Sequence, residues 1–532
     1  MKVGYIRRDG RITKKHLIVT FAGVASFAQE RIFLDEKVRF SNKVAIYNEL
    51  IILRLVEGRL STDRLEEALR SVLTKHKILR TSLIFDDNES TLKQSIIDIH
   101  KTFALIDEEN FEDEDELVKI IYETTVDANL FDLSRGRVFH CAVLRHNREE
   151  DHRFITDSDI LLIALHHAAY DRTSKHIFLK DFCMVYNKGG DMSVGQEALE
   201  YIDYSVHERL MNMSVSREFW RRELEGYNLQ RPLSLPVDRR SPSTDQRSGL
   251  SSTAEIRFDD AMLTSFFTYA SANEVTPFQL GLAVFYAFLL KLTHGQNDLC
   301  VACLNANRYR TELQTMIGMF VAALPYRVQL DSDWSFKQLL DYVQVKSLAV
   351  LEHAHYPLQH ILADSHFEEA NGKFLETSFD FVTTSANTNV ISFDGLTLEQ
   401  LPLQNVSEIA KYDFALRFFH DATSNDRKLS FRFICSRDLF DETTVTSIAR
   451  RFEYLCAQIF SEELNGFHND RSNGSLDELT IILPEEMDEI ERINFHRITD
   501  VLTEGTYSIT LFIVLFKTLL RLTKSISDHR YG

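Results

Sequence analysis

Apolar positions along the chain alternate between a strand spacing and a helix spacing. Residues 160–165 (ILLIAL) form an apolar run without alternation, which is typical of a strand buried on both faces. A helical spacing follows at 174–186, where one stripe holds Ile177, Phe178, Phe182 and Val185. The same reasoning predicts further strands and helices at 79–85, 116–126, 138–145, 299–304, 336–351 and 443–460. Strands and helices in alternation predict a mixed α/β fold.

Two helix starts carry recognisable local signals. The segment that begins at Leu60 predicts one, with Asp63 and Glu66 as a capping pair in the first turn. Thr276 and Pro277 predict the start of a strongly apolar helix, since Thr caps and Pro suits the first turn. Residues 236–249 are polar and contain proline, which indicates a connector. The sequence has neither a 20–50-residue repeat nor a glycine-rich phosphate loop.

Composition narrows the class of protein. The 532 residues include 60 Lys and Arg against 79 Asp and Glu, a net charge of −19 that excludes a basic nucleic-acid footprint for the chain as a whole. Six cysteines are too few for a disulfide scaffold and favour a reducing, cytoplasmic compartment. By length alone, three or four domains are expected.

Two segments imitate targeting signals. Basic residues between 7 and 15 precede the apolar run 17–27, as in a secretory signal, although a first core strand explains the same pattern. Residues 508–520 are apolar, but they are too few for a membrane span and Lys517 interrupts them. We therefore expect no membrane association, and packing of this tail against other sequence is the preferred interpretation.

The candidate chemistry lies directly after the 160–165 strand, in the sequence His166-His167-Ala168-Ala169-Tyr170-Asp171. Successive strand side chains point to opposite faces, so only one of the two histidines can face a given cavity. Asp171 lies across a turn from His167, where a carboxylate can orient the loop or pair with an arginine from a neighbouring strand. A buried histidine pair satisfied by backbone carbonyls is the structural alternative.

Other chemical groupings are weaker. Cys300 and Cys303 have redox or metal spacing, but they lie in an apolar strand without a second cysteine pair. The histidines of residues 353–360 imitate a metal cluster without a carboxylate to complete it. We therefore expect no metal site.

Around the two histidines, ordered segments of the chain resemble the condensation domain of nonribosomal peptide synthetases. The signature of that family is H-H-x-x-x-D-G at a strand-to-helix junction. Further segments are similar to family motifs in the same order: 26–34 (SFAQERIFL), 75–83 (KHKILRTSL), 201–205 (YIDYS), 307–312 (NRYRTE), 317–321 (IGMFV) with Arg327 after it, 353–360 (HAHYPLQH), 412–416 (YDFAL) and 437–440 (RDLF). The resemblance covers about residues 20–460.

The resemblance implies an architecture. Two lobes like chloramphenicol acetyltransferase would form a pseudo-dimer with a tunnel between them. Residues 1–188 would form the N-terminal lobe with the H-H-x-x-x-D motif, and residues 189–465 the C-terminal lobe. Residues 466–496 resemble the linker that leads into an adenylation domain, and residues 497–532 form an unassigned tail.

The resemblance also implies an activity: amide-bond formation between a donor acyl thioester and an acceptor aminoacyl thioester. Both would be carried on phosphopantetheine arms of carrier proteins in a synthetase module, with no tightly bound cofactor. Among the catalytic-motif residues His166, His167 and Asp171, His167 would be the general base or would position the amine and stabilise the tetrahedral intermediate. Asp171 would be structural, paired with Arg80 or Arg308, and His166 would pack on the opposite side of the strand.

Departures from the family pattern keep two alternatives open. Arg172 stands where the family has Gly, and its side chain could crowd the tunnel. Three further departures are Asn307 in place of a Gly, Ala322-Ala323 in place of Asn-Thr, and Phe33 in place of Trp. The first alternative is an acyltransferase that takes a soluble thioester donor. The second is a non-catalytic domain that binds carrier proteins.

Overall fold

The computed structural model describes residues 22–493 except for residues 42, 147–152, 189–198, 229–232, 241–245, 366–374, 385–389, 394, 402–407, 423–427, 461–473 and 491. Residues 1–479 form one compact unit and residues 480–532 a second. Everything that positions the candidate site lies in the first unit. The expectations for residues 497–532 and for the apolar segment 508–520 fall outside the described residues.

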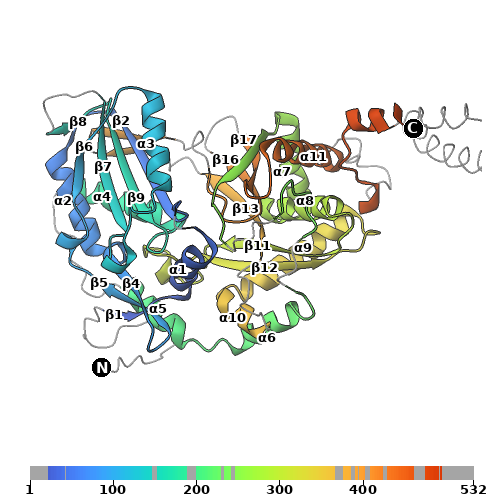
Figure 1. The fold of residues 1–532 in the computed structure, drawn as a ribbon, viewed down its shortest axis with the longest axis horizontal. Helices are drawn as coiled ribbons and strands as arrows, with labels where there is room; N and C mark the ends of the chain where they lie inside the picture. The colour runs from blue at the N-terminus through green and yellow to red at the C-terminus, as the bar shows by residue number, and fades with distance from the viewer. Residues whose placement is uncertain are drawn as a thin grey trace, which may run out of the picture. The chain divides into compact units, whose positions relative to one another are not determined.

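A six-stranded sheet carries the His166-His167 segment at the end of a central strand (Figure 1). Its strands, in spatial order, are β14 (Val390–Phe393), β15 (Leu396–Gln400), β2 (Asn48–Glu57), β9 (Ile160–His166), β7 (Phe139–His146) and β6 (Leu105–Phe111). Strand β9 pairs antiparallel with β2 and with β7. The β14–β15 hairpin comes from much later in the chain and extends this sheet at β2.

Alternate residues of β9 enter two different cores. Leu161, Ile163 and Leu165 belong to the cluster that packs against α2 (Thr62–Lys75) and α4 (Arg172–Lys188). The intervening residues join the cluster beneath α3 (Glu114–Val126). Every residue of β9 is buried. The uninterrupted apolar run of this strand therefore reflects burial on both faces.

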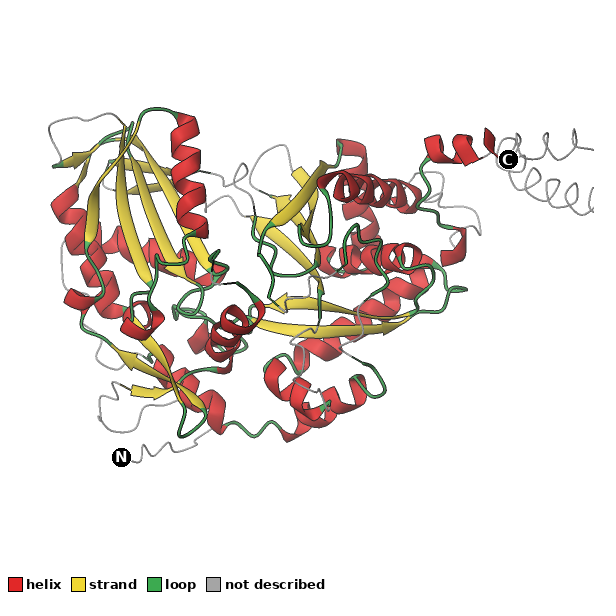
Figure 2. Ribbon diagram, viewed as in Figure 1, coloured by secondary structure: helices red, strands yellow, loops and turns green. Residues whose placement is uncertain are grey.

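A second six-stranded sheet lies in the C-terminal half (Figure 2). Its strands, in spatial order, are β10 (Ser251–Arg257), β17 (Lys428–Ser436), β16 (Phe414–Asp421), β13 (Thr377–Thr384), β11 (Asp298–Asn305) and β12 (Ala322–Gln329). The helices of this half include α7 (Asp260–Ala272), α8 (Pro277–Leu292), α9 (Phe336–Glu352) and α11 (Glu442–Phe460). Phe418, Phe431 and Phe433 of the sheet contact Phe452 of α11 at ring-centroid distances of 4.8–6.1 Å. Much of the phenylalanine content is therefore core packing.

Two smaller sheets complete the described strands. A three-stranded sheet is formed by β1 (Ala22–Val24), β5 (Thr91–Ile96) and β4 (Thr81–Asp86), and a two-stranded one by β3 (Leu60–Ser61) and β8 (Phe154–Ile155). Further helices are α1 (Phe27–Arg39), α5 (Tyr201–Leu210), α6 (Ser214–Glu223) and α10 (Leu358–Asp364).

Most predicted elements match; one local prediction was wrong, and two predicted strands have shifted bounds. The N-cap of α2 is Ser61, whose hydroxyl accepts from Arg64 N, so Asp63 and Glu66 do not form the capping pair. A turn of 3₁₀ helix occupies Lys77–Arg80, which delays the start of the strand predicted at 79–85. In the run 17–27, residues 17–21 are outside the described range, Ala22–Val24 form the strand β1, and Ser26 then caps a helix.

Among the described residues, no single helix is long and apolar enough to cross a membrane. Helices α7 and α8 pass that test of length and composition only as a pair, and they are bent by 107° relative to each other.

Candidate active site

His166 ends β9 and turns away from open space. Its ring is buried, meets Phe131 edge-on at 5.6 Å, and accepts a hydrogen bond from Ala168 N through Nδ1 at 3.1 Å. Its Nε2 lies 3.4 Å from a carboxylate oxygen of Glu36. His166 therefore packs inside the fold.

His167 leaves the strand and lines a cavity. Its backbone N–H donates to Tyr47 O at 2.8 Å, and its Nδ1 lies 2.6 Å from Tyr170 O. Because a carbonyl oxygen only accepts, Nδ1 carries the proton. In the neutral ring Nε2 then presents a lone pair, and it lies 3.6 Å from Glu49 Oε1.

Burial and neighbouring charges together set the charge states of His167 and Glu49. Burial lowers the pKa of His167 to about 4, and the nearby Glu49 carboxylate only partly opposes this effect. Burial also opposes ionisation of Glu49, but Lys411, His167 and Arg172 together lower its pKa to about 2. At neutral pH the site therefore holds an uncharged imidazole beside an ionised carboxylate.

Asp171 locks the turn that follows His167. Its side chain is fully buried, and Oδ1 accepts from Ser174 N and Ser174 Oγ, both at 2.8 Å. These contacts cap the start of α4. The same carboxylate accepts from Arg308 Nη2 at 2.8 and 3.0 Å and from Phe320 N at 3.3 Å. Five hydrogen bonds hold Asp171, and two of its partners come from the C-terminal half.

The partner of Asp171 is Arg308, and Arg80 is not. Arg308 Nη1 also donates to the carbonyls of Leu313 and Met316, and its guanidinium lies 4.2 Å from the centre of the Phe320 ring. Arg80 instead donates to Leu73 O and Ile97 O. The turn that carries Arg308 passes through Asn307 at φ 51°, a left-handed conformation that Asn tolerates better than most residues other than Gly.

Other motif segments meet behind this ion pair. Tyr201 donates its hydroxyl proton to Met319 O and accepts from Ser26 Oγ at 2.7 Å. A Cβ on Gly318 would lie 2.1 Å from the Tyr201 ring. The motif residues at 26, 201 and 318 therefore form one packed contact that supports the cavity wall.

The cavity measures about 500 Å³ and takes its lining from both halves. His167, Glu49 and Arg172 contribute from the N-terminal half. The lining from the C-terminal half includes Asp380, Lys411 and Arg417. Glu49 and Lys411 were missed from the sequence, because neither was singled out in a motif and they are 362 residues apart.

Arg172 is the first residue of α4 and is exposed at the lining of this cavity. It is not among the residues with positive φ, so the backbone at this position does not require the freedom of glycine. Its charge helps to lower the pKa of Glu49. It also acts on Lys175, whose pKa falls to about 8 through burial and then through Arg172.

The weaker sequence candidates do not converge on a site. Cys300 and Cys303 are buried in β11, and burial raises the pKa of both thiols. His353 and His355 both contact Ser216 Oγ, while His360 packs edge-on against Phe27. Within the described part of the chain, no group of three or more His, Cys, Asp or Glu side chains is placed to hold a metal ion.

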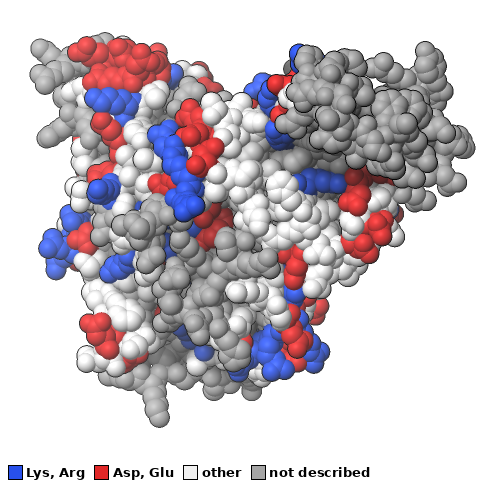
Figure 3. All heavy atoms as spheres, turned by 45° about the vertical axis from the view of Figure 1, so that its right-hand side comes forward, with Lys and Arg blue, Asp and Glu red and all other residues white. Residues whose placement is uncertain are grey.

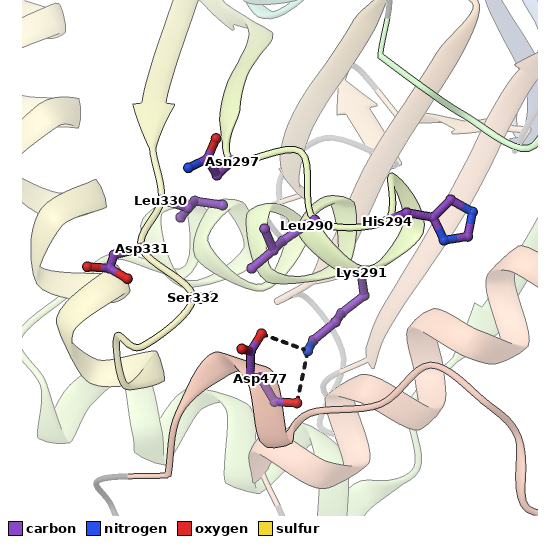
Figure 4. Close-up of a pocket in the computed structure, with 9 residues that line it drawn as sticks. Leu290, Lys291, His294, Asn297, Leu330, Asp331, Ser332 and Asp477 are labelled. Carbon is purple, nitrogen blue, oxygen red and sulfur yellow. Dashed lines mark hydrogen bonds and ion pairs between the residues drawn. The ribbon is translucent and has the colours of Figure 1, made fainter.

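A second cavity, of about 660 Å³, lies at the C-terminal end of α8 (Figure 4). Lys291 Nζ donates to Asp477 O at 3.1 Å and lies 3.6 Å from the carboxylate of the same residue. None of the predicted catalytic residues lines this cavity. We therefore place the candidate chemistry at the His167 cavity.

Solved structures of other proteins share this fold. The fold resembles that of the X-domain from teicoplanin biosynthesis, with a TM-score of 0.70 at 20% identity over 90% of this chain and 100% of that one. It also resembles the condensation domain from monacolin K polyketide synthase MokA, with a TM-score of 0.65 at 17% identity over 84% of this chain and 98% of that one. The expected fold of chloramphenicol-acetyltransferase-like lobes is thereby confirmed.

The model of the condensation domain family matches residues 23–469, and the chain belongs to that family. Curated relatives include surfactin synthase subunit 2 of Bacillus subtilis, 27% identical over 80% of this chain and 11% of the relative. Tyrocidine synthase 2 of Brevibacillus parabrevis is 25% identical over 76% of this chain and 11% of the relative. The chain thus spans about a tenth of the length of these relatives.

Proposed function

We propose that this protein joins a donor acyl thioester to the amine of an acceptor aminoacyl thioester as an amide. The observation that carries the proposal is the neutral His167, whose Nε2 lone pair opens on a cavity lined by both halves of a condensation-family fold. An unprotonated imidazole at such a position is a competent proton acceptor.

The reaction balances without any further reactant. The acceptor nitrogen bonds to the donor carbonyl carbon, the carbon–sulfur bond breaks, and one proton passes from nitrogen to the leaving thiolate. His167 Nε2 either takes that proton or holds the amine and stabilises the tetrahedral intermediate. Asp171 and Arg308 act by position, because their ion pair fixes the turn whose Tyr170 carbonyl holds the His167 tautomer.

In this proposal both thioesters arrive on phosphopantetheine arms of carrier proteins, and an adenylation domain or a synthetase module loads the acceptor. The protein would work in the cytosol. Its six cysteines are all free and a catalytic thiol is not needed. The chain as a whole carries a net charge of −19, which does not itself attract a carrier protein. Basic and acidic side chains lie interspersed on the face in Figure 3, so a carrier would dock through the local charge of one part of the surface.

The direct test supplies the full chain with two loaded carrier proteins and detects the condensed product on the acceptor carrier by mass spectrometry. We expect product with the wild type and a loss of about 100-fold or more with His167→Ala, the usual scale for removal of an acid–base group. His176→Ala is the matched control, because His176 is an exposed histidine on α4 outside the cavity lining.

Three results would count against the proposal. Equal product from wild type and His167→Ala would remove the role of His167. Product formed only from a soluble thioester donor would favour an acyltransferase that needs no donor carrier. Binding of carriers without any product would indicate a carrier-binding domain.

A further inference from the structure

Two hydrogen-bond acceptors lie next to each other in the cavity wall. His167 Nε2 has no proton, because the proton of the ring lies on Nδ1 toward Tyr170 O. The Glu49 carboxylate also only accepts, and its Oε1 lies 3.6 Å from Nε2. At that separation no hydrogen bond joins the two atoms. Both residues instead line the cavity.

Lys411 compensates the charge of the Glu49 carboxylate only in part. Lys411 Nζ lies 3.4 Å from Glu49 Oε1, at the long limit of a hydrogen bond, and sits 5.1 Å from the centre of the Tyr47 ring. The Glu49 side chain keeps 43% of its surface exposed. Lys411 therefore keeps Glu49 ionised without covering it.

We infer that Glu49 binds the acceptor nitrogen as an ammonium ion, with His167 Nε2 as the second acceptor of the same group. A nitrogen about 2.9 Å from both atoms completes a triangle whose base is the 3.6 Å separation. This inference rests on the proposed function and names the form in which its amine substrate arrives.

The arrangement has a chemical consequence. A free α-amine has a pKa of about 7.7–8.0, so at neutral pH most of the acceptor is ammonium. Glu49 selects that abundant form, and one N–H then points at Nε2. The ammonium gives up two protons as the amide forms: the first leaves through Nε2 to solvent and frees the nitrogen to attack the carbonyl, and the second passes to the leaving thiolate. A hydroxyl acceptor brings no positive charge to Glu49. The site is therefore selective for amines over alcohols.

The inference can be tested by binding alone, without catalysis. The probes are glycyl-pantetheine amide, in which a stable amide replaces the thioester, and acetyl-pantetheine amide, which lacks only the amino group. We expect the wild-type full chain to bind the glycyl compound about tenfold more tightly in titration calorimetry at pH 7, as for hydrogen bonds to charged groups. Glu49→Gln should abolish this preference.

Two further variants separate ammonium binding from a structural role. Glu57→Gln makes the same charge change on the same strand, at an exposed residue outside the cavity lining, and should keep the preference. Lys411→Met removes the cation that contacts Glu49 and leaves Arg172 in place, so the preference should increase. If Glu49 only anchored Lys411, then Glu49→Gln and Lys411→Met would have the same effect, and that result would overturn the inference.

The pH dependence of probe binding provides an independent test. Wild-type affinity for the glycyl probe should stay constant from about pH 6 to 7 and fall above about pH 8, where the ammonium loses its proton. Glu49→Gln lacks the negative charge that distinguishes ammonium from free amine, so in that variant the fall should disappear.

Equal affinity of the wild type for both probes would refute the inference. Absence of product with loaded carriers would instead refute the proposed function, whatever the binding result.

Discussion

The Asp171–Arg308 ion pair joins the catalytic-motif turn to the C-terminal half, and its removal gives a sharp prediction. We consider Arg308→Met, Asp171→Asn and the double variant. In Arg308→Met the buried carboxylate keeps Ser174 and Phe320 as donors but loses its counter-charge. The carbonyls of Leu313 and Met316 lose a donor at the same time.

The expected cost follows from burial. The exposed fractions of the two side chains are 5% for Arg308 and 0% for Asp171, so solvent cannot replace the missing partner. Removing one member of a buried pair costs about 3–5 kcal/mol. The unfolding entropy of the unit that spans residues 1–479 is about 1 kcal/mol/K, so this cost lowers the melting temperature by about 4 °C.

A double-mutant cycle in urea provides the assay. The double variant carries no unpaired buried charge, so it should cost no more than either single change, which requires a coupling energy of at least about 3 kcal/mol. Arg80→Met is the control: Arg80 also donates to two carbonyls but does not touch Asp171, so its cost should add to that of Asp171→Asn. Additive effects of Arg308→Met and Asp171→Asn would refute the reasoning.

Two other predictions concern the same region. The folded pKa of His167, about 4, lies below its unfolded value of 6.5, so the unfolded chain binds a proton first as the pH falls through that window. Relative to His167→Gln, the wild type should therefore lose about 2 kcal/mol of unfolding free energy between about pH 7 and pH 5 in urea titrations; parallel pH curves for the two proteins would contradict this. Gly318→Ala should lower the melting temperature by an amount that corresponds to about 1–3 kcal/mol, because the new Cβ would overlap the anchored Tyr201 ring, and an unchanged melting temperature would show that the ring can move.

Much of the fold could be predicted from the sequence because its signals are local. The run 160–165 has no polar residue to place on a solvent face, and it proved to be the central strand β9. Thr276 caps α8 and Pro277 occupies its first turn, as their order in the sequence predicts. The capping prediction at Asp63 failed because Ser61, two residues earlier, already supplies the oxygen that the helix start needs.

The site was only half predictable, since its geometry depends on contacts between distant segments. The sequence left Arg80 and Arg308 as equal candidates for Asp171, because both lie in motif-like segments. Only the folded chain shows that the turn through Asn307 brings Arg308, 137 residues away, onto the carboxylate. Arg172 shows a related limit, because it stands exposed at the position where the family motif has glycine. The motif alone does not reveal whether that position needs a backbone conformation that only glycine adopts easily.

Glu49 marks the point at which motif reasoning stops being informative. A motif points to the side chain proposed to act in the reaction, here His167 directly after β9. The charge around that histidine is set by residues that reach it from other segments, and Glu49 and Lys411 come from β2 and from the loop before β16. In the inference drawn above, these two residues control whether the cavity attracts a cation, and they thereby determine which form of acceptor His167 meets. Selectivity in this site therefore depends on pairs that a motif search cannot find, and the opposite effects expected for Glu49→Gln and Lys411→Met test that dependence directly.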